Sequence, residues 1–539
     1  NILPFSKSGN KTILDLAIAD TEDPSIGKGF NGKLMERYAN LDFAKIDPRS
    51  NAMEYDAALA KVATADIVLI QLQYFVRSGE MTGFLSKEVK ELINKVLATG
   101  KPCVAISFGN PYLVMDFPKV DAYVCTYGGG DVSEEAAAQI IFGEESAAGK
   151  LPISIPGVFQ FGDGVEYPKQ ALRDGRPEEA GFNSKMLSKV DDVMAQAISD
   201  SAFPGAVLLV VKDGIVVHNE AYGAYTYEPS SKLIDNTTMY DLASVTKVTS
   251  TTSAVMRLYD EGKIRLEDPI VKYIPAFGQK GKEKITVYNL MVHNSGLPAW
   301  RTFYIFCNDP QCVLDSIFSA ELVYKTGDSS VYSDLGLITM GKVIEKVSGT
   351  TLDKFVDSVF FKPLGMKNTM YNPPAKLIPF IAPTEVDNYW KKTGIAVRGR
   401  VHDENAATLG GVSGHAGLFS TAPDLAILLQ MELNGGTYGG RRYLKEETIR
   451  MFTKRQSERS TRGIGWDTRS LKGYSFVGSQ FSDKSFIHTG FTGTSVAVDP
   501  TRNLIVVFLT NRVYPTRNNS KLFDVRPKVH NAVVNALTK

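Results

Sequence analysis

Two side chains near the middle of the sequence have the types and spacing of a nucleophile and its base. Ser244 and Lys247 are three residues apart in the segment Tyr240–Leu266, YDLASVTKVTSTTSAVMRLYDEGKIRL. On a helix, positions i and i+3 share a face, so the hydroxyl and the amine can come within hydrogen-bond reach. An alcohol is a weak nucleophile until an adjacent base takes its proton, and a desolvated lysine can be that base. The backbone N–H of Ser244 would also point toward a developing oxyanion.

This spacing is not specific by itself, because Ser and Lys are common residues. A second copy, Ser8–Lys11, lies in a polar N-terminal stretch with no helix behind it. The central segment is predicted to be one long helix. Capping and turn residues precede it at 235–237, and Gly262 stands where a left-handed C-terminal cap would form. A catalytic role for this segment requires partners elsewhere in the chain.

Two later segments can supply the partners. Tyr332, followed by Ser333 and Asp334, opens an apolar helical run. A phenolate there can shuttle a proton if Lys247 and the helix dipole stabilise it. Alternatively, Tyr332 is only an aromatic residue packed at a helix start.

His488, Thr489 and Gly490 begin a strand-like segment, HTGFTGTSVAVDP. A strand edge with Gly at the third position lets a substrate backbone approach closely. The N–H of Phe491 would then be a second oxyanion donor, opposite that of Ser244.

The elements around these residues predict an α+β domain. Strand-like runs occur at both of its ends, and Asp-Gly between the first two is a strong hairpin signal. The predicted elements are a helix over 184–198, strands over 206–211, 215–222, 494–498 and 504–510, and a helix over 528–537. We expect one antiparallel sheet built from both ends, with the helical middle packed on it.

Three motifs occur in order along the chain: Ser-x-x-Lys at 244–247, Tyr-x-Asp at 332–334 and His-Thr-Gly at 488–490. This order resembles that of the serine penicillin-recognising enzymes. Three further segments agree: Ile285–Pro298 (ITVYNLMVHNSGLP), Lys362–Tyr371 (KPLGMKNTMY) and His402–Thr421 (HDENAATLGGVSGHAGLFST). The region from about residue 176 to 539 is similar to the class C β-lactamase, D,D-peptidase and esterase family. The resemblance implies a β-lactamase-like fold for residues 183–539, an antiparallel sheet flanked by helices.

The resemblance also implies a role for each catalytic residue. Ser244 would be the acylated nucleophile, and Lys247 and Tyr332 would form the proton-transfer pair. The backbone N–H groups of Ser244 and Phe491 would be the oxyanion donors. No cofactor and no metal are expected.

The substrate-binding residues depart from the family pattern at two positions. Asp334 stands where the family usually has Asn in contact with the substrate amide, and its negative charge disfavours an anionic substrate nearby. His488, before Thr489 and Gly490, stands where most members have Lys facing the substrate carboxylate. Histidine is a cation only when protonated, with an unperturbed pKa of ~6.5. Both departures weaken the case for β-lactam hydrolysis and leave peptidase or esterase action open.

Three residues of a Gly-rich loop raise a metal alternative. His402, Asp403 and His415 lie close in sequence but form no His-Glu-x-x-His helix. The two histidines are more simply donors or acceptors that anchor the loop.

The first 166 residues predict an α/β sandwich with a mainly parallel, flavodoxin-like or Rossmann-like sheet. Strand-like and helix-like segments alternate over 13–19, 32–38, 65–72, 86–99, 103–108, 122–125 and 133–142. Gly27–Leu34 (GKGFNGKL) satisfies G-x-G-x-x-G, but a phosphate loop fails at Leu34, where Ser or Thr is needed. A dinucleotide site fails because the strand has ended by Asp20, well before the first Gly. Nucleotide binding remains an alternative to a simple Gly-rich loop.

Three segments carry a second resemblance: Ser107–Pro118 (SFGNPYLVMDFP), Ala137–Pro152 (AAQIIFGEESAAGKLP) and the run GKLPISIPGVFQFGDGVEYP from Gly149. They resemble the C-terminal α/β domain of family-3 glycoside hydrolases, especially bacterial β-N-acetylglucosaminidases. The family's catalytic residues lie on a preceding barrel, which this sequence lacks. We therefore expect a structural remnant or interaction module over residues 1–166, a polar linker over 167–182, and a glucosaminidase barrel in a parent polypeptide.

Composition limits the remaining function classes. The 539 residues predict two to four domains, and a net charge of +1 does not favour nucleic acid or a membrane surface. No apolar run reaches the ~18 residues of a spanning helix. The first residue is Asn1, so we expect a trimmed product whose leader is lost. Cys103 and Cys125 read as buried thiols, whereas Cys307 and Cys312 either close a local disulfide or stay free.

The sequence therefore predicts a periplasmic or secreted serine hydrolase. It would form an acyl-enzyme on an ester, a D-amino-acid peptide or a β-lactam, with cell-wall (peptidoglycan) fragments as substrate. The alternative is an inactive binding or scaffold protein for cell-wall material, or part of a larger glucosaminidase fusion.

Overall fold

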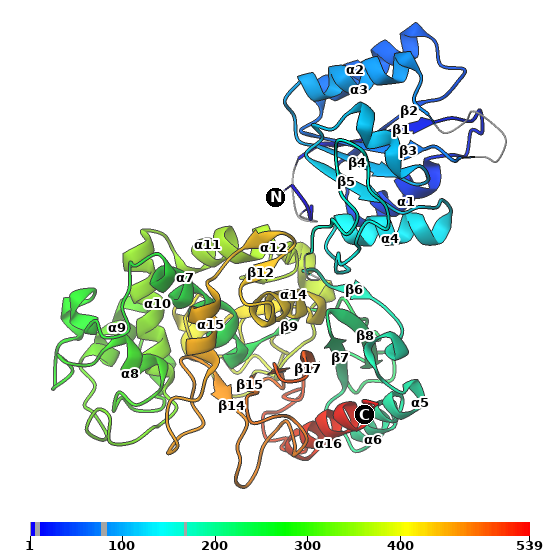
Figure 1. Cartoon of the computed structure of the whole chain (residues 1–539). Helices are drawn as coiled ribbons and strands as arrows, with labels where there is room; N and C mark the ends of the chain where they lie inside the picture. Colours follow the sequence, from blue (N-terminus) through cyan, green and yellow to red (C-terminus); the bar gives the residue numbers. More distant parts are fainter. Residues whose placement is uncertain (1, 6–10, 77–83, 167–169, 539) are drawn as a thin grey trace. The chain divides into compact units, whose positions relative to one another are not determined.

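The protein divides into two compact units. The computed structural model describes residues 2–5, 11–76, 84–166 and 170–538. Unit 1 comprises Asn1–Ala171 and Gly439–Arg441, and unit 2 comprises Leu172–Tyr438 and Arg442–Lys539 (Figure 1). The second Ser-x-x-Lys copy begins at Ser8, which lies outside the described residues.

Unit 1 is built on a five-stranded sheet in which every pairing is parallel. Its strand order is β2-β1-β3-β4-β5, which is the order of flavodoxin-like folds. The strands are β1 (Ile13–Ala19), β2 (Leu41–Ile46), β3 (Ile67–Gln73), β4 (Cys103–Ser107) and β5 (Ala122–Cys125). The predicted flavodoxin-like α/β sandwich is confirmed.

Helices cover both faces of this sheet. They are α1 (Lys28–Arg37), α2 (Ala52–Thr64), α3 (Lys87–Ala98) and α4 (Asp131–Ile141). Helices α1 and α4 pack over one apolar core, and α2 and α3 pack over the other (Figure 1). Strand β2 and helix α2 were not predicted from the sequence. Strand β2 lies at the sheet edge and is mostly half-buried, so its LDFAKI sequence has no continuous apolar run.

A buried carboxyl group interrupts the apolar core of unit 1. Asp15 in β1 is fully buried and accepts hydrogen bonds from Gln71 Nε2 and Asn31 Nδ2. Burial raises the pKa of Asp15 to about 7, although both hydrogen bonds oppose the shift. A raised pKa means that the folded state holds a proton that the unfolded chain has released. This group therefore destabilises unit 1 progressively as the pH rises from about 4 to about 7.

We expect Asp15→Asn to remove this pH dependence, which amounts to roughly 1.4 kcal/mol per pH unit for one proton. The measurement is hydrogen exchange of β1 and β3 between pH 5 and 8, corrected for intrinsic exchange rates. In the wild type, protection should fall as the pH rises, and the variant should show a flatter profile. Asp56→Asn, at an exposed position of α2, is the control and should keep the wild-type slope. Equal slopes for the wild type and Asp15→Asn would contradict the assignment.

Unit 2 contains a seven-stranded sheet that joins its two chain ends. The order is β14-β15-β16-β17-β7-β8-β6, and only the pairing of β6 with β8 is parallel. The strands are β6 (Arg173–Asp174), β7 (Gly205–Lys212), β8 (Ile215–Gly223), β14 (Asp467–Thr468), β15 (Phe486–Thr489), β16 (Ser495–Asp499) and β17 (Leu504–Thr510). Strand β17 pairs with β7 along its whole length, so the predicted sheet is confirmed.

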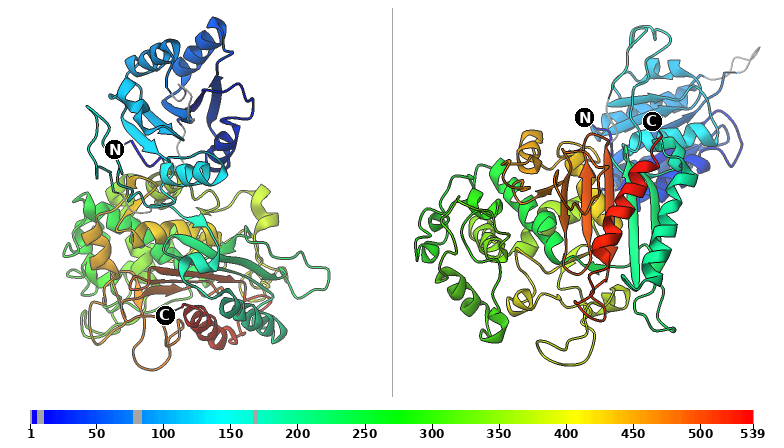
Figure 2. Two further views of the ribbon diagram at one scale, coloured as in Figure 1. Left: turned by 45° about the vertical axis from the view of Figure 1, so that its right-hand side comes forward. Right: turned by 90° about the horizontal axis from the view of Figure 1, so that it is seen from below.

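The Asp-Gly hairpin also forms as predicted. Asp213 and Gly214 have φ values of 52° and 74°, the positive pair that a tight two-residue turn requires. Three helices, α5 (Ser184–Leu187), α6 (Lys189–Ser199) and α16 (Leu522–Asn535), pack over one face of the sheet. Figure 2 shows α16 beside α5 and α6. The predicted helix over 184–198 is divided into α5 and α6, and α16 starts before the predicted residue 528, with Pro527 inside it.

The middle of unit 2 is mainly helical. Its helices are α7 (Ser253–Asp260), α8 (Val287–Met291), α9 (Pro310–Phe318), α10 (Asp334–Ser348), α11 (Leu352–Val356), α12 (Lys362–Leu364), α13 (Glu404–Thr408), α14 (Ala422–Leu433) and α15 (Glu446–Thr453). The remaining strands of the chain are β9 (Tyr240–Asp241), β10 (Met370–Tyr371), β11 (Leu418–Ser420), β12 (Thr437–Tyr438) and β13 (Arg441–Arg442), of which β13 begins at Arg441, the last residue of unit 1. Strand β11 joins β10 to β9, which ends three residues before Ser244.

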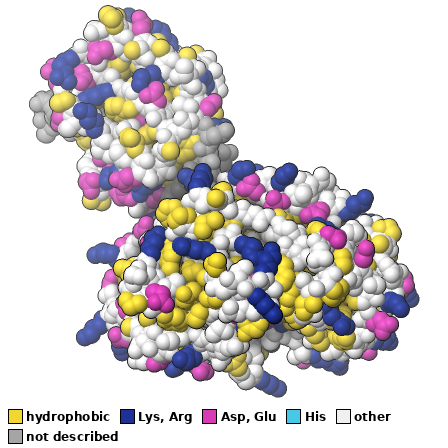
Figure 3. Space-filling view, turned by 180° about the vertical axis from the view of Figure 1, so that it is seen from behind, with side chains coloured by type: hydrophobic (Ala, Val, Ile, Leu, Met, Phe, Trp, Pro, Cys, Tyr) yellow, Lys and Arg dark blue, Asp and Glu magenta, His cyan; other side chains and the backbone are white. Residues whose placement is uncertain are grey.

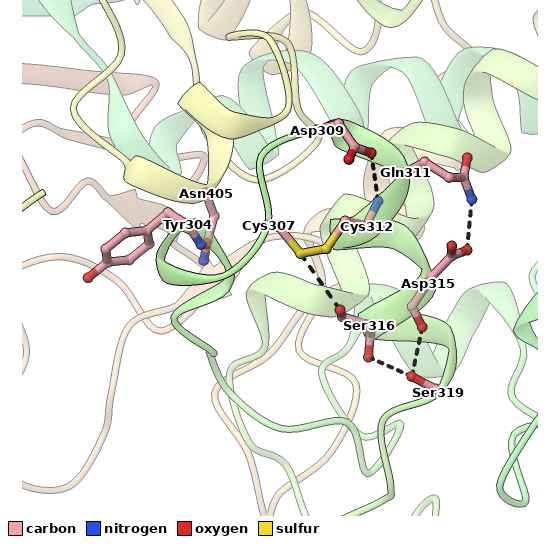
Figure 4. The surroundings of a disulfide bond; sticks show 9 residues. All are labelled: Tyr304, Cys307, Asp309, Gln311, Cys312, Asp315, Ser316, Ser319 and Asn405. Carbon is pink, nitrogen blue, oxygen red and sulfur yellow. Dashed lines mark hydrogen bonds between the residues drawn. A yellow bond between two sulfur atoms is a disulfide. The ribbon is translucent and has the colours of Figure 1, made fainter. Parts of the chain in front are cut away.

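A disulfide fixes the loop before α9. Cys307 and Cys312 are bonded, so the disulfide alternative is confirmed (Figure 4). Asp309 caps α9 by accepting a hydrogen bond from the N–H of Cys312. Cys103 is a buried free thiol and Cys125 is half-buried.

The surface carries charges of both signs. On the face drawn in Figure 3, Lys and Arg side chains are interspersed with Asp and Glu side chains. No helix within the described ranges is both long and apolar enough to cross a membrane.

Candidate active site

The segment that carries Ser244 is not one continuous helix. It starts as strand β9, continues as a 3-10 turn over Ala243–Val245, widens into a π-helix over Lys247–Thr252, and ends as α7. The prediction of a single continuous helix is therefore wrong for the N-terminal half of this segment. Ala243 has a positive φ of 45°, and its N–H donates to the Asp241 side chain. This sharp turn presents Ser244 as a half-buried residue among buried neighbours.

The hydroxyl side chains of this segment explain the wider helix. Thr252 Oγ1 donates to the Lys247 carbonyl, and Ser253 Oγ donates to the Val248 carbonyl, each five residues back. Hydroxyls that bond to backbone carbonyls compete with regular α-helical bonds. Single π turns of this kind are frequent at functional sites. The cap prediction is confirmed by Gly262, which has a φ of 70° just after α7.

Lys247 lies at the centre of the candidate site. Its side chain is fully buried, and its Nζ atom lies 2.9 Å from Ser244 Oγ and 2.9 Å from the His415 carbonyl oxygen. A third contact, 2.7 Å to Asp334 Oδ1, is an ion pair. The sequence spacing thus correctly predicted that the hydroxyl and the amine meet.

The charge on Lys247 differs from the expectation of a desolvated neutral base. Burial acts to lower the pKa of Lys247, but Asp334 and Tyr332 outweigh burial and raise this pKa. The structure therefore holds Lys247 as an ammonium. The sequence predicts only a substrate contact for Asp334, because Asp334 lies 87 positions after Lys247 and no local pattern reveals their contact.

Tyr332 lies beside the same ammonium. The Nζ atom of Lys247 is 4.9 Å from the centroid of the Tyr332 ring, and Tyr332 precedes the Ser333 N-cap of α10. Burial raises the pKa of Tyr332, while Lys247 and the Ser244 hydroxyl oppose this shift without reversing it. The expected phenolate is therefore disfavoured at rest, and Tyr332 is a neutral phenol that can donate a proton.

His488 is a neutral imidazole in this environment. Burial and the nearby cations Lys247 and Arg462 lower the pKa of His488 to about 3. Its Nδ1 atom lies 2.9 Å from the Thr489 carbonyl oxygen, which can only accept, so Nδ1 carries the proton. Among the described residues, Nε2 has no hydrogen-bond partner. The unperturbed pKa used in the sequence analysis therefore does not apply, because the sequence did not reveal how deeply His488 is buried.

The His-Thr-Gly segment closes strand β15 and does not open a strand, in contrast to the prediction. A turn follows it and returns the chain as β16, with the Gly490 N–H donating to the Thr494 carbonyl at 2.7 Å. Thr494 Oγ1 donates to the Leu242 carbonyl at 2.8 Å. This bond fastens the turn that contains Phe491 to the residues just before Ser244, as an oxyanion site with one donor from each segment would require.

The residues of the metal alternative fall into two groups. His402 Nε2 lies 3.0 Å from Glu385, and the His402 N–H donates to Asp241. His415 Nε2 lies 3.0 Å from Asp403 Oδ1. A ligand atom from each of Asp334, Asp403 and His415 lies within 4.8 Å of the other two. The ammonium of Lys247, 2.7 Å from Asp334, supplies positive charge at this position.

Two further residues of the site were not singled out from the sequence. The guanidinium carbon of Arg462 lies 5.1 Å from the Tyr332 ring centroid, and Arg462 forms an ion pair with Asp467 at 3.2 Å. The His293 ring centroid lies 4.6 Å from that of Tyr332, with the two rings tilted by 37°, and His293 accepts a hydrogen bond from the N–H of Ser333. His293 lies in the segment ITVYNLMVHNSGLP, which offered a signal, but no motif marks Arg462.

Comparison with known proteins supports this architecture. Residues 190–529 match the family model described as Beta-lactamase, and residues 1–193 match that of the Glycosyl hydrolase family 3 C-terminal domain. A Salmonella paratyphi B protein, provisionally named D-alanyl-D-alanine carboxypeptidase, is 36% identical over 389 residues, covering 66% of this chain and 89% of the relative.

Two solved structures share the fold at low identity. A penicillin-binding protein homologue from Caulobacter crescentus has a TM-score of 0.54 at 20% identity, covering 66% of this chain and 99% of that one. A class C β-lactamase from Rhodobacter sphaeroides has a TM-score of 0.52 at 18% identity, covering 65% and 99%. Because the matching family model spans more than half of the sequence, this chain belongs to the beta-lactamase family of serine hydrolases, with a family-3 glycoside hydrolase C-terminal domain before it.

Proposed function

We propose that this chain is a D,D-carboxypeptidase-type serine hydrolase that forms an acyl-enzyme on Ser244. The observation that carries the proposal is the 2.9 Å contact between Ser244 Oγ and the buried Lys247 Nζ, beside the Tyr332 phenol. The name of the Salmonella relative gives the substrate class, a peptide that ends in D-alanyl-D-alanine. Cell-wall fragments supply such peptides.

In the proposed reaction, Lys247 in its neutral form takes the Ser244 proton as Oγ attacks the substrate carbonyl carbon. The N–H groups of Ser244 and Phe491 stabilise the oxyanion. Tyr332 then donates a proton to the leaving amine as the C–N bond breaks, and Lys247 returns a proton to Tyr332. Water hydrolyses the resulting ester by the same proton transfers in reverse.

Arg462 is proposed to bind the carboxylate of the leaving D-alanine. The side of the site where this carboxylate would bind is formed by His488, Thr489 and Gly490. A neutral His488 supplies no positive charge there. Arg462 is near enough to His488 to lower the pKa of His488, and it also forms an ion pair with Asp467 at 3.2 Å. Arg462 therefore provides the cation that the family pattern places at position 488.

The test compares an N-acylated D-alanyl-D-alanine peptide with p-nitrophenyl acetate. The wild type should release D-alanine, and Arg462→Gln should raise KM for the peptide about tenfold or more, because a charge-assisted bond is worth roughly 1.5–3 kcal/mol. The KM for the uncharged ester should not change. Arg450→Gln, which removes an exposed cation on α15, is the control. Ester hydrolysis without release of D-alanine would favour an esterase, and inactivity on both would favour a binding protein.

For the remaining chain, we propose a structural or interaction module over residues 1–166, a linker over 167–182 and the hydrolase over 183–539. A periplasmic or secreted location fits cell-wall substrates. A glucosaminidase barrel in a parent polypeptide remains part of this proposal.

A further inference from the structure

Asp334 stands where the family usually has Asn, and its contacts suggest why the charge matters. It is the first residue of α10, where a helix dipole stabilises a carboxylate. Its Oδ1 atom lies 2.7 Å from Lys247 Nζ, and its side chain is 18% exposed while that of Lys247 is 0% exposed. Asparagine could accept a hydrogen bond at this position but could not balance the ammonium charge.

The three partners of Lys247 Nζ determine where its lone pair can point. The His415 carbonyl and the Asp334 carboxylate can only accept hydrogen bonds, whereas the Ser244 hydroxyl can accept or donate. An ammonium donates to the His415 carbonyl and the Ser244 hydroxyl and forms an ion pair with Asp334, whose Oδ1 atom lies outside hydrogen-bond geometry. A neutral amine can keep its bond to the His415 carbonyl and turn its lone pair toward the Ser244 proton. Loss of one proton thus converts the same geometry from a resting state into a base aimed at the nucleophile.

We propose that Asp334 is the positioning residue that holds Lys247 as an ammonium in the free enzyme and keeps its Nζ atom beside Ser244, where the amine becomes the base once a proton has left. This inference rests on the proposed serine hydrolase function. In the free enzyme the proton leaves to water, and the neutral amine then accepts the Ser244 proton as the Oγ–carbon bond forms. Asp334 itself forms no bond to the substrate in this step.

Other charged and titratable groups also face Lys247, and Asp334 dominates among them. Within the described parts of the chain, it is the one carboxylate in ion-pair contact with Lys247. Burial lowers the pKa of both His488 and His293, which are therefore neutral. The remaining neighbours are the neutral Tyr332 phenol, the Arg462 cation over the Tyr332 ring, and the Asp403–His415 pair, in which Asp403 is near enough to Lys247 for the ammonium to lower the pKa of Asp403.

The experiment measures kcat/KM for p-nitrophenyl acetate against pH, because this ratio reports ionisations of the free enzyme. Asp334→Asn should move the midpoint of the acid limb to lower pH by about 1–3 units, since it removes an opposite charge in contact with Lys247. Asp334→Glu keeps the charge and should retain the wild-type midpoint with a lower maximal rate. An unmoved midpoint in Asp334→Asn would overturn the inference.

A wild-type measurement keeps the inference testable if Asp334→Asn does not fold. The wild-type kcat/KM should still rise with pH above pH 8, and a plateau below pH 7 would overturn the inference. Ser244→Ala separates this inference from the proposed function. If Ser244→Ala retains ester turnover, the proposed nucleophile is wrong. If turnover depends on Ser244 but the Asp334→Asn midpoint is unmoved, only the role of Asp334 is wrong.

Discussion

Lys247→Met is expected to lower the rate of acylation by a reactive ester about 10³-fold, the middle of the range for loss of a general base. Methionine is close in length to lysine and apolar, so it can fill the buried volume that the lysine stem leaves. It cannot take the Ser244 proton, donate to the His415 carbonyl or form an ion pair with Asp334. The measurement is the burst rate of p-nitrophenol release in a stopped-flow instrument.

The same substitution should destabilise unit 2. Removing one partner of a buried ion pair costs roughly 3–5 kcal/mol, because the other charge stays buried without compensation. The double variant Lys247→Met/Asp334→Asn removes both charges, so we expect it to recover much of the lost stability and none of the lost activity. Recovery of activity in the double variant would mean that Lys247 acts on Ser244 only through folding.

Gly490→Ala is expected to have the second largest effect, through backbone geometry alone. A Cβ atom at this position would lie 2.3 Å from the Leu242 carbonyl oxygen and 2.2 Å from Thr494 Oγ1. The Leu242 contact cannot be relieved by a side-chain rotation, so the turn must move away from the segment that carries Ser244. The Phe491 N–H moves with it. Loss of one oxyanion donor costs about 10²–10³-fold in kcat.

The control for this prediction is Gly336→Ala on α10. A Cβ atom there meets its nearest neighbour, the Leu290 side chain, at 3.6 Å, which is ordinary contact. This variant should keep its activity and gain up to about 1 kcal/mol of helix stability. Steady-state kcat on p-nitrophenyl acetate distinguishes the two glycines. Equal activity in both variants would contradict the position assigned to the Phe491 donor.

The sequence predicted the fold class well because hydrophobic patterning carries that information. The Asp213–Gly214 hairpin and the paired strands β7 and β17 follow from apolar runs and turn residues. The strand β2 was missed because an edge strand buries little and keeps charged residues. The broken helix around Ser244 was missed because its small, apolar sequence is compatible with a regular helix. Only the tertiary contacts of Asp241 and the hydroxyl bonds to the backbone select the 3-10 and π turns.

The site residues were predictable where they are local in sequence. The Ser244–Lys247 contact requires only a three-residue spacing, which a 3-10 turn meets as well as an α-helix does. The Lys247–Asp334 ion pair and the position of Arg462 depend on how distant segments pack, so no local pattern reveals them. The protonation states also come from burial. The pKa of His488 lies far below its usual value because the folded chain encloses it, and the sequence contains no measure of that enclosure.

The most direct test of the account is to locate the acyl group. The protein is incubated with p-nitrophenyl acetate and, separately, with a penicillin, quenched in acid, and analysed by intact mass and peptide mapping. We predict one acyl group per chain, on the peptide that contains Ser244. It should be absent from Ser244→Ala and present in Ser8→Ala, which changes the second Ser-x-x-Lys copy. A reactive ester that labels Ser244→Ala as it labels the wild type would contradict Ser244 as the nucleophile.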